Sequence, residues 1–183
     1  MFRDWRQDTV DTISRCFLND SKYWKVDQIC GGKVRAKAVL DIIRARYSEL
    51  KEIFVASTIM NNTPPDFDKK QFLKFCQKAG MIDRKMNNNV FSTYWKQTNF
   101  EEIEQDNNDD NKLNRFEFLE ILLRIAKGKY IDFGKETQLA YAFTKLLQTY
   151  ILPMLPKLWP LQSWRDDHLW TTEINEFFKV NEG

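Results

Sequence analysis

The hydrophobic residues of this chain recur with helical spacing over most of its length. The longest pattern runs from residue 34 to about residue 58 and keeps to one face of a 3.6-residue repeat. Its apolar positions are Val39, Ile42, Ile43, Tyr47, Leu50, Ile53 and Phe54. We therefore predict a long central helix there. Strict alternation of apolar and polar residues is hard to find, and the chain has only 6 glycines and 5 prolines, so the sequence predicts an all-α fold.

Shorter amphipathic patterns lie on both sides of this helix. The predicted helices cover residues 3–18, 89–98, 118–127, 136–152 and 170–178. A short apolar segment at residues 23–29 is stopped by Gly31 and Gly32. We expect the chain to turn after Gly128, and we expect Pro153 and Pro156 to break the helix before them. The proline- and aromatic-rich stretch that follows is predicted to pack over the core, or else to bind a groove of another protein.

Residues 106–117, DNNDDNKLNRFE, place oxygen-bearing side chains at alternate positions and end on a glutamate. Ca²⁺ takes six to eight oxygen ligands, and a short loop can wrap it only when alternate residues point inward. Asn111 occupies the tight-turn position that glycine usually takes. The pattern is therefore the ligand order of a calcium loop. The candidate metal ligands are Asp106, Asn108, Asp110, the Lys112 backbone carbonyl, Asn114 and a bidentate Glu117.

The helix predicted after this loop carries an apolar face at Phe118, Ile121, Leu122 and Ile125. Together with the loop, it resembles the second half of an EF-hand of the calmodulin superfamily. The helix predicted at residues 89–98 fits the entering helix of that family, but it leaves a loop roughly seven residues longer than the usual twelve. Two interpretations stay open: a functional Ca²⁺ site, and a solvated acidic surface loop on an EF-hand scaffold.

An earlier segment resembles a second, degenerate hand. Leu50, Ile53 and Phe54 take the spacing of its entering helix, and Phe67 takes the lone apolar position of its loop. Gln71 stands where the bidentate glutamate belongs, and a Pro-Pro pair lies where ligands should be, so we predict that this loop binds no metal. EF-hands occur in pairs that join through their loops. The resemblance therefore implies that Phe67 pairs with Leu113.

Composition excludes several classes of function. The formal charge is +2, from 28 basic and 26 acidic residues, which argues against a dedicated nucleic-acid binder. The single histidine and the 3 cysteines, none in a CxxC pair, leave little for zinc sites or histidine-based catalysis, and no common nucleotide, hydrolase or protease motif is present. No apolar run approaches the length of a membrane span. We therefore expect a protein that is not an enzyme and has no nucleic-acid, membrane or small-molecule partner.

These patterns predict a helical domain built around the divergent EF-hand pair. Residues 1–46 would be a helical segment packed on the EF-hand core, residues 47–127 the pair, and residues 128–183 the C-terminal helices. The string RFEFLEILLRIAKGKY is similar to degenerate EF-hand regions of ciliary and flagellar proteins of protists. That resemblance implies a structural protein of the cytoplasm and cytoskeleton, with a partner helix or microtubule-associated axonemal proteins as its partners. The alternative is a calcium sensor that binds Ca²⁺ through residues 106–117 and regulates a partner.

Overall fold

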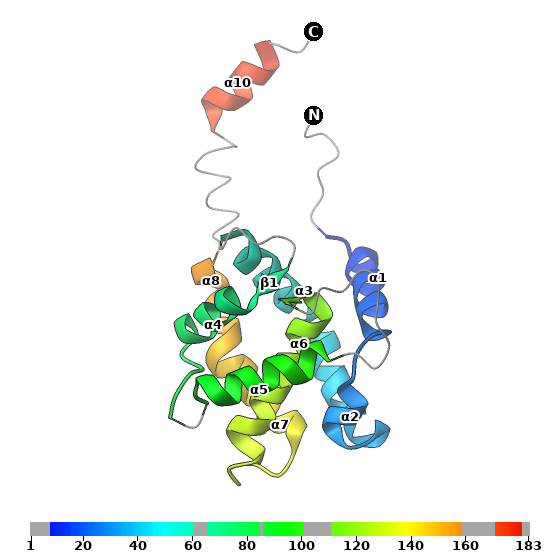
Figure 1. The fold of residues 1–183 in the computed structure, drawn as a ribbon. Coiled ribbons are helices and arrows are strands. Elements are labelled where there is room, and N and C mark those ends of the chain that lie inside the picture. The colour runs from blue at the N-terminus through cyan, green and yellow to red at the C-terminus, as the bar shows by residue number, and fades with distance from the viewer. Residues whose placement is uncertain (1–7, 61–65, 85, 101–110, 159–170, 181–183) are drawn as a thin grey trace.

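The structure is a computed structural model that describes residues 8–60, 66–84, 86–100, 111–158 and 171–180 (Figure 1). Helices make up most of these residues, and the two strands found among them have 2 residues each, so the predicted all-α class is confirmed. The α-helices are α1 (Val10–Ser21), α2 (Val26–Cys30), α3 (Lys33–Met60), α4 (Lys69–Lys78), α5 (Asn88–Asn99), α6 (Arg115–Ala126), α7 (Leu139–Leu146), α8 (Leu155–Leu158) and α10 (Thr172–Val180). The other elements are strands β1 (Phe67–Asp68) and β2 (Lys112–Leu113), the π-helical turns η1 (Lys127–Ile131) and η2 (Leu147–Ile151), and the 3₁₀ turn η3 (Leu152–Met154).

Polar side chains define where several of these helices begin. Thr9, Asp68, Asn87 and Asn114 each precede a helix, and the side chain of each accepts a hydrogen bond from a backbone amide of the first turn. These amides have no partner within the helix, so the caps satisfy donors that would otherwise be unpaired. Each such cap contributes about 1 kcal/mol to helix stability.

Two helix–loop–helix units are joined by the two short strands. The C-terminal half of α3, β1 and α4 form the first unit, and α5, β2 and α6 form the second. The strands pair antiparallel, with Phe67 opposite Leu113 and Asp68 opposite Lys112. The pairing expected between Phe67 and Leu113 is therefore confirmed, and a helix leaves each loop directly after its strand.

Phenylalanine rings from both units fill the space beneath the strands. Phe67 lies edge-on to Phe54 and Phe72 and stacks on Phe118, with centroid distances of 5.7, 5.6 and 5.9 Å. Phe72 also stacks on Phe91 of α5 at 5.8 Å. All of these rings are buried. Aromatic pairs of this kind contribute about 0.5–1.5 kcal/mol each beyond their buried area, so the cluster helps the strands to join the two units.

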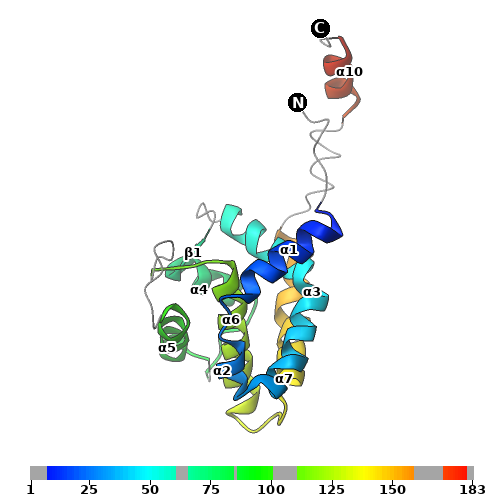
Figure 2. The same ribbon diagram turned by 90° about the vertical axis from the view of Figure 1, so that its right-hand side faces the viewer.

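The C-terminal helices extend this core along α3 and α6. The segment from α7 to α8 lies beside both helices (Figure 2). Its inward residues are Phe143, Leu146, Leu147, Ile151, Met154 and Leu158, all of them buried. The helix α3 runs without a break past residue 46, where we placed the boundary of the N-terminal segment. The first unit therefore shares a helix with the segment that precedes it.

Two local expectations about this region need correction. The turn expected after Gly128 is present at residues 132–134, but the backbone first stays helical through residues 127–131 as the π-turn η1. The expected break at Pro153 was wrong, because the backbone stays helical through η2, η3 and α8. Pro153 lies at the start of a new 3₁₀ turn, a position whose amide needs no helical partner, so its missing N–H costs little there.

The π-turn η1 places two residues that the core uses. Gly128 lies against the ring of Tyr94, and a β-carbon at this position would approach the Tyr94 hydroxyl to 2.0 Å. The next residue, Lys129, is buried and donates hydrogen bonds to the Met81 carbonyl at 3.1 Å and to the Asp83 carboxylate. The turn therefore attaches the connection between α4 and α5 to the end of α6.

A partly buried ion pair fixes α1 to the second unit. Arg115, the first residue of α6, donates to both carboxylate oxygens of Asp20 at 2.7 and 2.8 Å. The hydroxyl of Tyr47 on α3 donates to the same carboxylate. Burial and this hydrogen bond raise the pKa of Tyr47, so its hydroxyl remains a donor at every physiological pH. The three side chains thus connect α1, α3 and α6.

We expect Asp20→Asn to lower the free energy of unfolding by roughly 3 kcal/mol, because it leaves the Arg115 guanidinium half-buried without a counter-ion. Urea unfolding followed by circular dichroism measures this change. The matched control is Arg46→Ala, which removes the exposed pair between Arg46 and Glu49 and should change the free energy of unfolding by less than about 0.5 kcal/mol. Equal losses in the two variants would contradict the structural role of Asp20.

Candidate functional site

The predicted calcium ligands divide into two groups. Asp106, Asn108 and Asp110 lie outside the described residues. Lys112, Asn114 and Glu117 lie at the junction between β2 and α6, where the loop ends and the helix begins. The structure therefore brings the second group together at one end of the predicted site.

Asn114 and Glu117 form a reciprocal capping box. The Asn114 side-chain oxygen accepts from the Glu117 amide at 3.1 Å, and Glu117 Oε2 accepts from the Asn114 amide at 3.0 Å. Glu117 is 1% exposed. A bidentate metal ligand needs both carboxylate oxygens, so binding would have to release the Asn114 amide, at about 1–3 kcal/mol for a buried donor left unpaired.

The backbone carbonyl of Lys112 also has a partner. It accepts a hydrogen bond from the side-chain amide of Asn99 at 3.0 Å. Asn99 is the last residue of α5 and is buried, so this bond ties the end of the entering helix to β2. The two ends of the long loop are therefore held together by protein groups.

The first unit repeats the geometry with different chemistry. Asp68 caps α4 by accepting from the Gln71 amide at 2.7 Å, as Asn114 caps α6. Gln71 occupies the position that corresponds to Glu117, and its buried side-chain oxygen accepts no hydrogen bond from the described residues. An amide offers one neutral oxygen where Glu117 offers a carboxylate. Our prediction that this loop binds no metal rests on that difference and on Pro64 and Pro65, which lie outside the described residues.

Within the described ranges, no three His, Cys, Asp or Glu side chains are grouped so that they could hold a metal ion. The same ranges contain no helix with the length and apolar character needed to cross a membrane.

A second polar cluster, which the sequence patterns did not predict, holds α2 against the second unit. The backbone amide of Lys25 donates to Glu120 Oε1, while the Lys25 ammonium donates to the Thr98 carbonyl at 3.3 Å and to the Phe100 carbonyl. Lys25 therefore contacts the end of α5 and the middle of α6 at once. The one signal in the sequence was Glu120 itself, a carboxylate inside the apolar run FEFLEILL.

Burial sets the electrostatics of this cluster. Glu120 is 1% exposed, and burial raises the pKa of its carboxyl group despite the Lys25 amide and the nearby cations. On the next turn of α6, burial lowers the pKa of Arg124. The Arg124 guanidinium donates to the Gln97 carbonyl of α5 at 3.3 Å. The cluster thus joins α5 to α6 through groups that carry a desolvation cost.

The chain matches no protein-family model, no curated protein and no solved structure. The kind of ligand that the site could bind is therefore inferred from its own residues and geometry.

We expect the stability of the wild type to fall relative to Glu120→Gln as pH rises. Because burial raises the folded-state pKa of Glu120 above its ordinary value of 4.5, the native protein holds this proton more tightly than the unfolded chain does. Native stability is then lost as pH rises from about 4.5 through the folded pKa. The glutamine introduced in this variant would keep an oxygen for the Lys25 amide but cannot ionise.

Urea unfolding of both proteins from about pH 4 to about pH 8 measures the difference, in which the other titrating groups largely cancel. Parallel stability curves over this range would show that Glu120 is not desolvated.

Proposed function

We propose that this chain is a non-catalytic interaction module built on a divergent EF-hand pair of the calmodulin superfamily. The observation that carries the proposal is the antiparallel pairing of Phe67 with Leu113 between two helix–loop–helix units. In each unit the paired apolar residue is followed by a capping residue and, three positions after the cap, by Gln71 or Glu117. This order corresponds to the apolar position, the ninth position and the last ligand position of an EF-hand loop.

The local chemistry supports a scaffold more than a metal switch. Gln71 lacks the bidentate carboxylate of the last ligand position, and one oxygen of Glu117 is used by the capping box. The Lys112 carbonyl is bonded to Asn99. The roles of holding the loop ends together and starting the exiting helix are thus performed by protein groups.

The covering of α3 and α6 also supports this proposal. EF-hand sensors act by exposing an apolar groove to a partner. Here the apolar faces of α3 and α6 are covered by the chain's own α7 to α8 segment, including Phe143, Leu146 and Ile151. Exposing each of these side chains would cost about 1.5–3 kcal/mol. Partners of this module would therefore bind its outer surface.

For the class of partner, we extend the resemblance of residues 115–130 to ciliary and flagellar EF-hand regions. On that basis we propose a microtubule-based cytoskeletal assembly, such as a ciliary axoneme, as the cellular setting. The support for this step is the sequence resemblance alone.

The second candidate function is a calcium sensor. It is favoured by the position of Glu117, which is buried at the end of an acidic loop beside Asn114 and the Lys112 carbonyl. Asp106, Asn108 and Asp110 would supply the remaining oxygens. A bound Ca²⁺ would there neutralise the carboxylates and order the loop between α5 and α6.

Calorimetric titration with Ca²⁺ of the wild type and of Glu117→Gln separates the two functions. The glutamine keeps an oxygen that can accept from the Asn114 amide, so the helix cap is retained while a metal-binding charge is lost. If the protein is a scaffold, we expect the wild type and the variant to give the same result, with no Ca²⁺-binding heat that is specific to the wild type. A saturable wild-type heat that disappears in Glu117→Gln would overturn the scaffold proposal in favour of the sensor.

A further inference from the structure

A surface pocket of about 580 Å³ lies between the corner that joins α2 to α3 and the segment from η1 to the start of α7. Its apolar lining includes Ile29, Cys30 and Leu139. Burial, aided by the nearby Asp27 carboxylate, raises the pKa of Cys30 to about 11, so the thiol stays protonated and behaves as an apolar group. The pocket therefore has an apolar part beside its polar lining residues.

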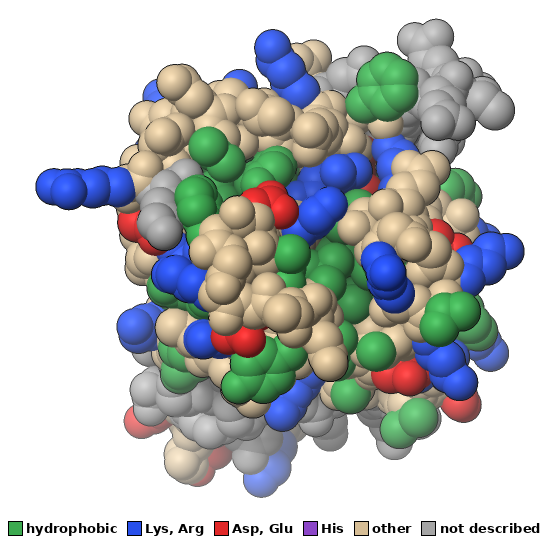
Figure 3. All heavy atoms as spheres, turned by 90° about the horizontal axis from the view of Figure 1, so that it is seen from below, with side chains coloured by type: hydrophobic (Ala, Val, Ile, Leu, Met, Phe, Trp, Pro, Cys, Tyr) green, Lys and Arg blue, Asp and Glu red, His purple; other side chains and the backbone are tan. Residues whose placement is uncertain are grey.

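The charged residues that line this pocket are all basic. They are Arg35 and Lys127, both exposed, and no aspartate or glutamate of the described residues joins them in the lining. A smaller pocket of about 340 Å³ shares Lys127 and adds Arg124, with Asp132 as its acidic residue. At the rim, Val34 is 91% exposed. Seen from below, this end of the molecule has hydrophobic side chains in hollows, with Lys and Arg and some Asp and Glu side chains beside them (Figure 3).

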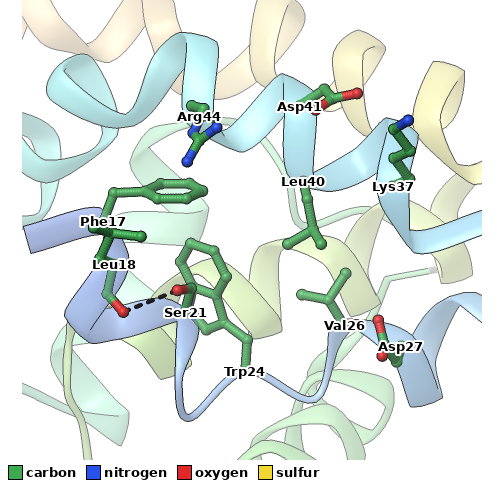
Figure 4. Close-up of a pocket in the computed structure, with 10 residues that line it drawn as sticks. All are labelled: Phe17, Leu18, Ser21, Trp24, Val26, Asp27, Lys37, Leu40, Asp41 and Arg44. Atoms are coloured by element: carbon green, nitrogen blue, oxygen red, sulfur yellow. Dashed lines mark hydrogen bonds between the residues drawn. The ribbon is translucent and has the colours of Figure 1, made fainter. Parts of the chain in front are cut away.

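A second apolar pocket, of about 480 Å³ between α1 and α3, differs in its charge (Figure 4). Lys37 and Arg44 line it together with Asp27 and Asp41, so its basic and acidic residues balance. Of these two pockets, the one with Arg35 and Lys127 better suits a ligand that combines apolar groups with negative charge. We call it the basic pocket.

The C-terminal helix α10 has this combination. Glu173, Phe177 and Val180 are spaced i, i+4 and i+7 and share one face, and Glu176 lies at the edge of that face. Phe177 and Val180 are 64% and 84% exposed, and both glutamates are exposed. The face thus offers bulky apolar groups flanked by carboxylates, which complements the basic pocket in both respects.

We propose that α10 of one copy of this chain docks in the basic pocket of a second copy, with Glu173 and Glu176 beside Arg35 and Lys127. A helix on one copy and a pocket on the next make a head-to-tail contact, which can propagate into longer assemblies. The partner of the proposed interaction module would then be a second copy of the same chain. This inference rests on the proposed function only in treating the chain as a protein that assembles with others.

A second copy is the occupant because the chain's own α10 is poorly placed to reach. The 28 residues of α3 span about 42 Å, with α2 near its lower end and α8 near its upper end (Figure 1). The chain from Leu158 to Thr172, which joins α8 to α10, can span at most about 46–50 Å when fully extended. Docking within one chain would need this segment to be close to fully extended, whereas docking between copies has no such requirement.

Sedimentation velocity over a range of protein concentrations tests the contact with two charge-reversal variants. Arg35→Glu with Lys127→Glu makes the pocket acidic, and Glu173→Lys with Glu176→Lys makes the helix basic. Each variant alone sets like charges against each other, so we expect its association to require at least about tenfold higher concentration than the wild type. An equimolar mixture restores opposite charges at every contact and should associate again. The matched control is Lys37→Glu with Arg44→Glu at the balanced pocket, which should associate like the wild type.

Circular dichroism and urea unfolding of each variant check that it folds; the altered side chains are all exposed. Concentration-dependent association that each variant loses and the mixture restores supports the contact. A wild type that stays monomeric, or association that the reversals leave unchanged, overturns it. Protection of α10 from hydrogen exchange at concentrations where the chain is monomeric would show docking within one chain and would also overturn it. None of these outcomes depends on Ca²⁺, so the calorimetric test of the proposed function remains separate.

Discussion

The pairing of Phe67 with Leu113 is the constraint on which the other contacts depend. Both residues are completely buried, and each lies directly before the cap of a helix, so the pairing fixes where α4 and α6 begin relative to each other. The Phe67 ring contacts rings from α3, α4 and α6, which ties the strand pairing to the aromatic core. The strand pairing would not be sufficient alone, because a ladder of two residues supplies few hydrogen bonds.

Charged side chains then attach the remaining helices to this centre. Asp20 holds α1 to the start of α6, Lys25 holds α2 to α5 and α6, and Lys129 holds the connection after α4. These contacts bear on the choice between scaffold and sensor. A sensor must move α5 relative to α6, and that movement would separate Lys25 from either Thr98 or Glu120. The N-terminal helices therefore favour one fixed arrangement of the second unit.

The spacing of hydrophobic residues correctly located the helices that bury one face in the core. The spacing of Leu50, Ile53 and Phe54 identified the buried face of α3, and the loop positions of Phe67 and Leu113 predicted their pairing. The π-turns were not predictable in this way, because a turn of 5 residues is too short for its apolar spacing to be told apart from that of an α-helix. The role of Lys25 was hidden for another reason: its contacts are with backbone carbonyls and with Glu120, which lies far from it in the sequence. Half of the predicted ligands lie in residues 101–110, outside the described residues, so the complete calcium site stays a prediction.

The hydrogen bond between Asn99 and Lys112 explains how this fold can accommodate so long a loop. In a calcium loop the ion draws the two helices together, so the loop length is set by coordination geometry. Here a side-chain hydrogen bond and the β1–β2 pairing hold the ends, and the length between them is limited mainly by closure entropy. Lengthening a loop from about 12 to about 19 residues raises that cost by only about 0.4 kcal/mol. Because protein groups hold the two ends of the loop together, the fold does not require the loop to keep its ligand spacing, and the two units can keep their arrangement without a bound ion.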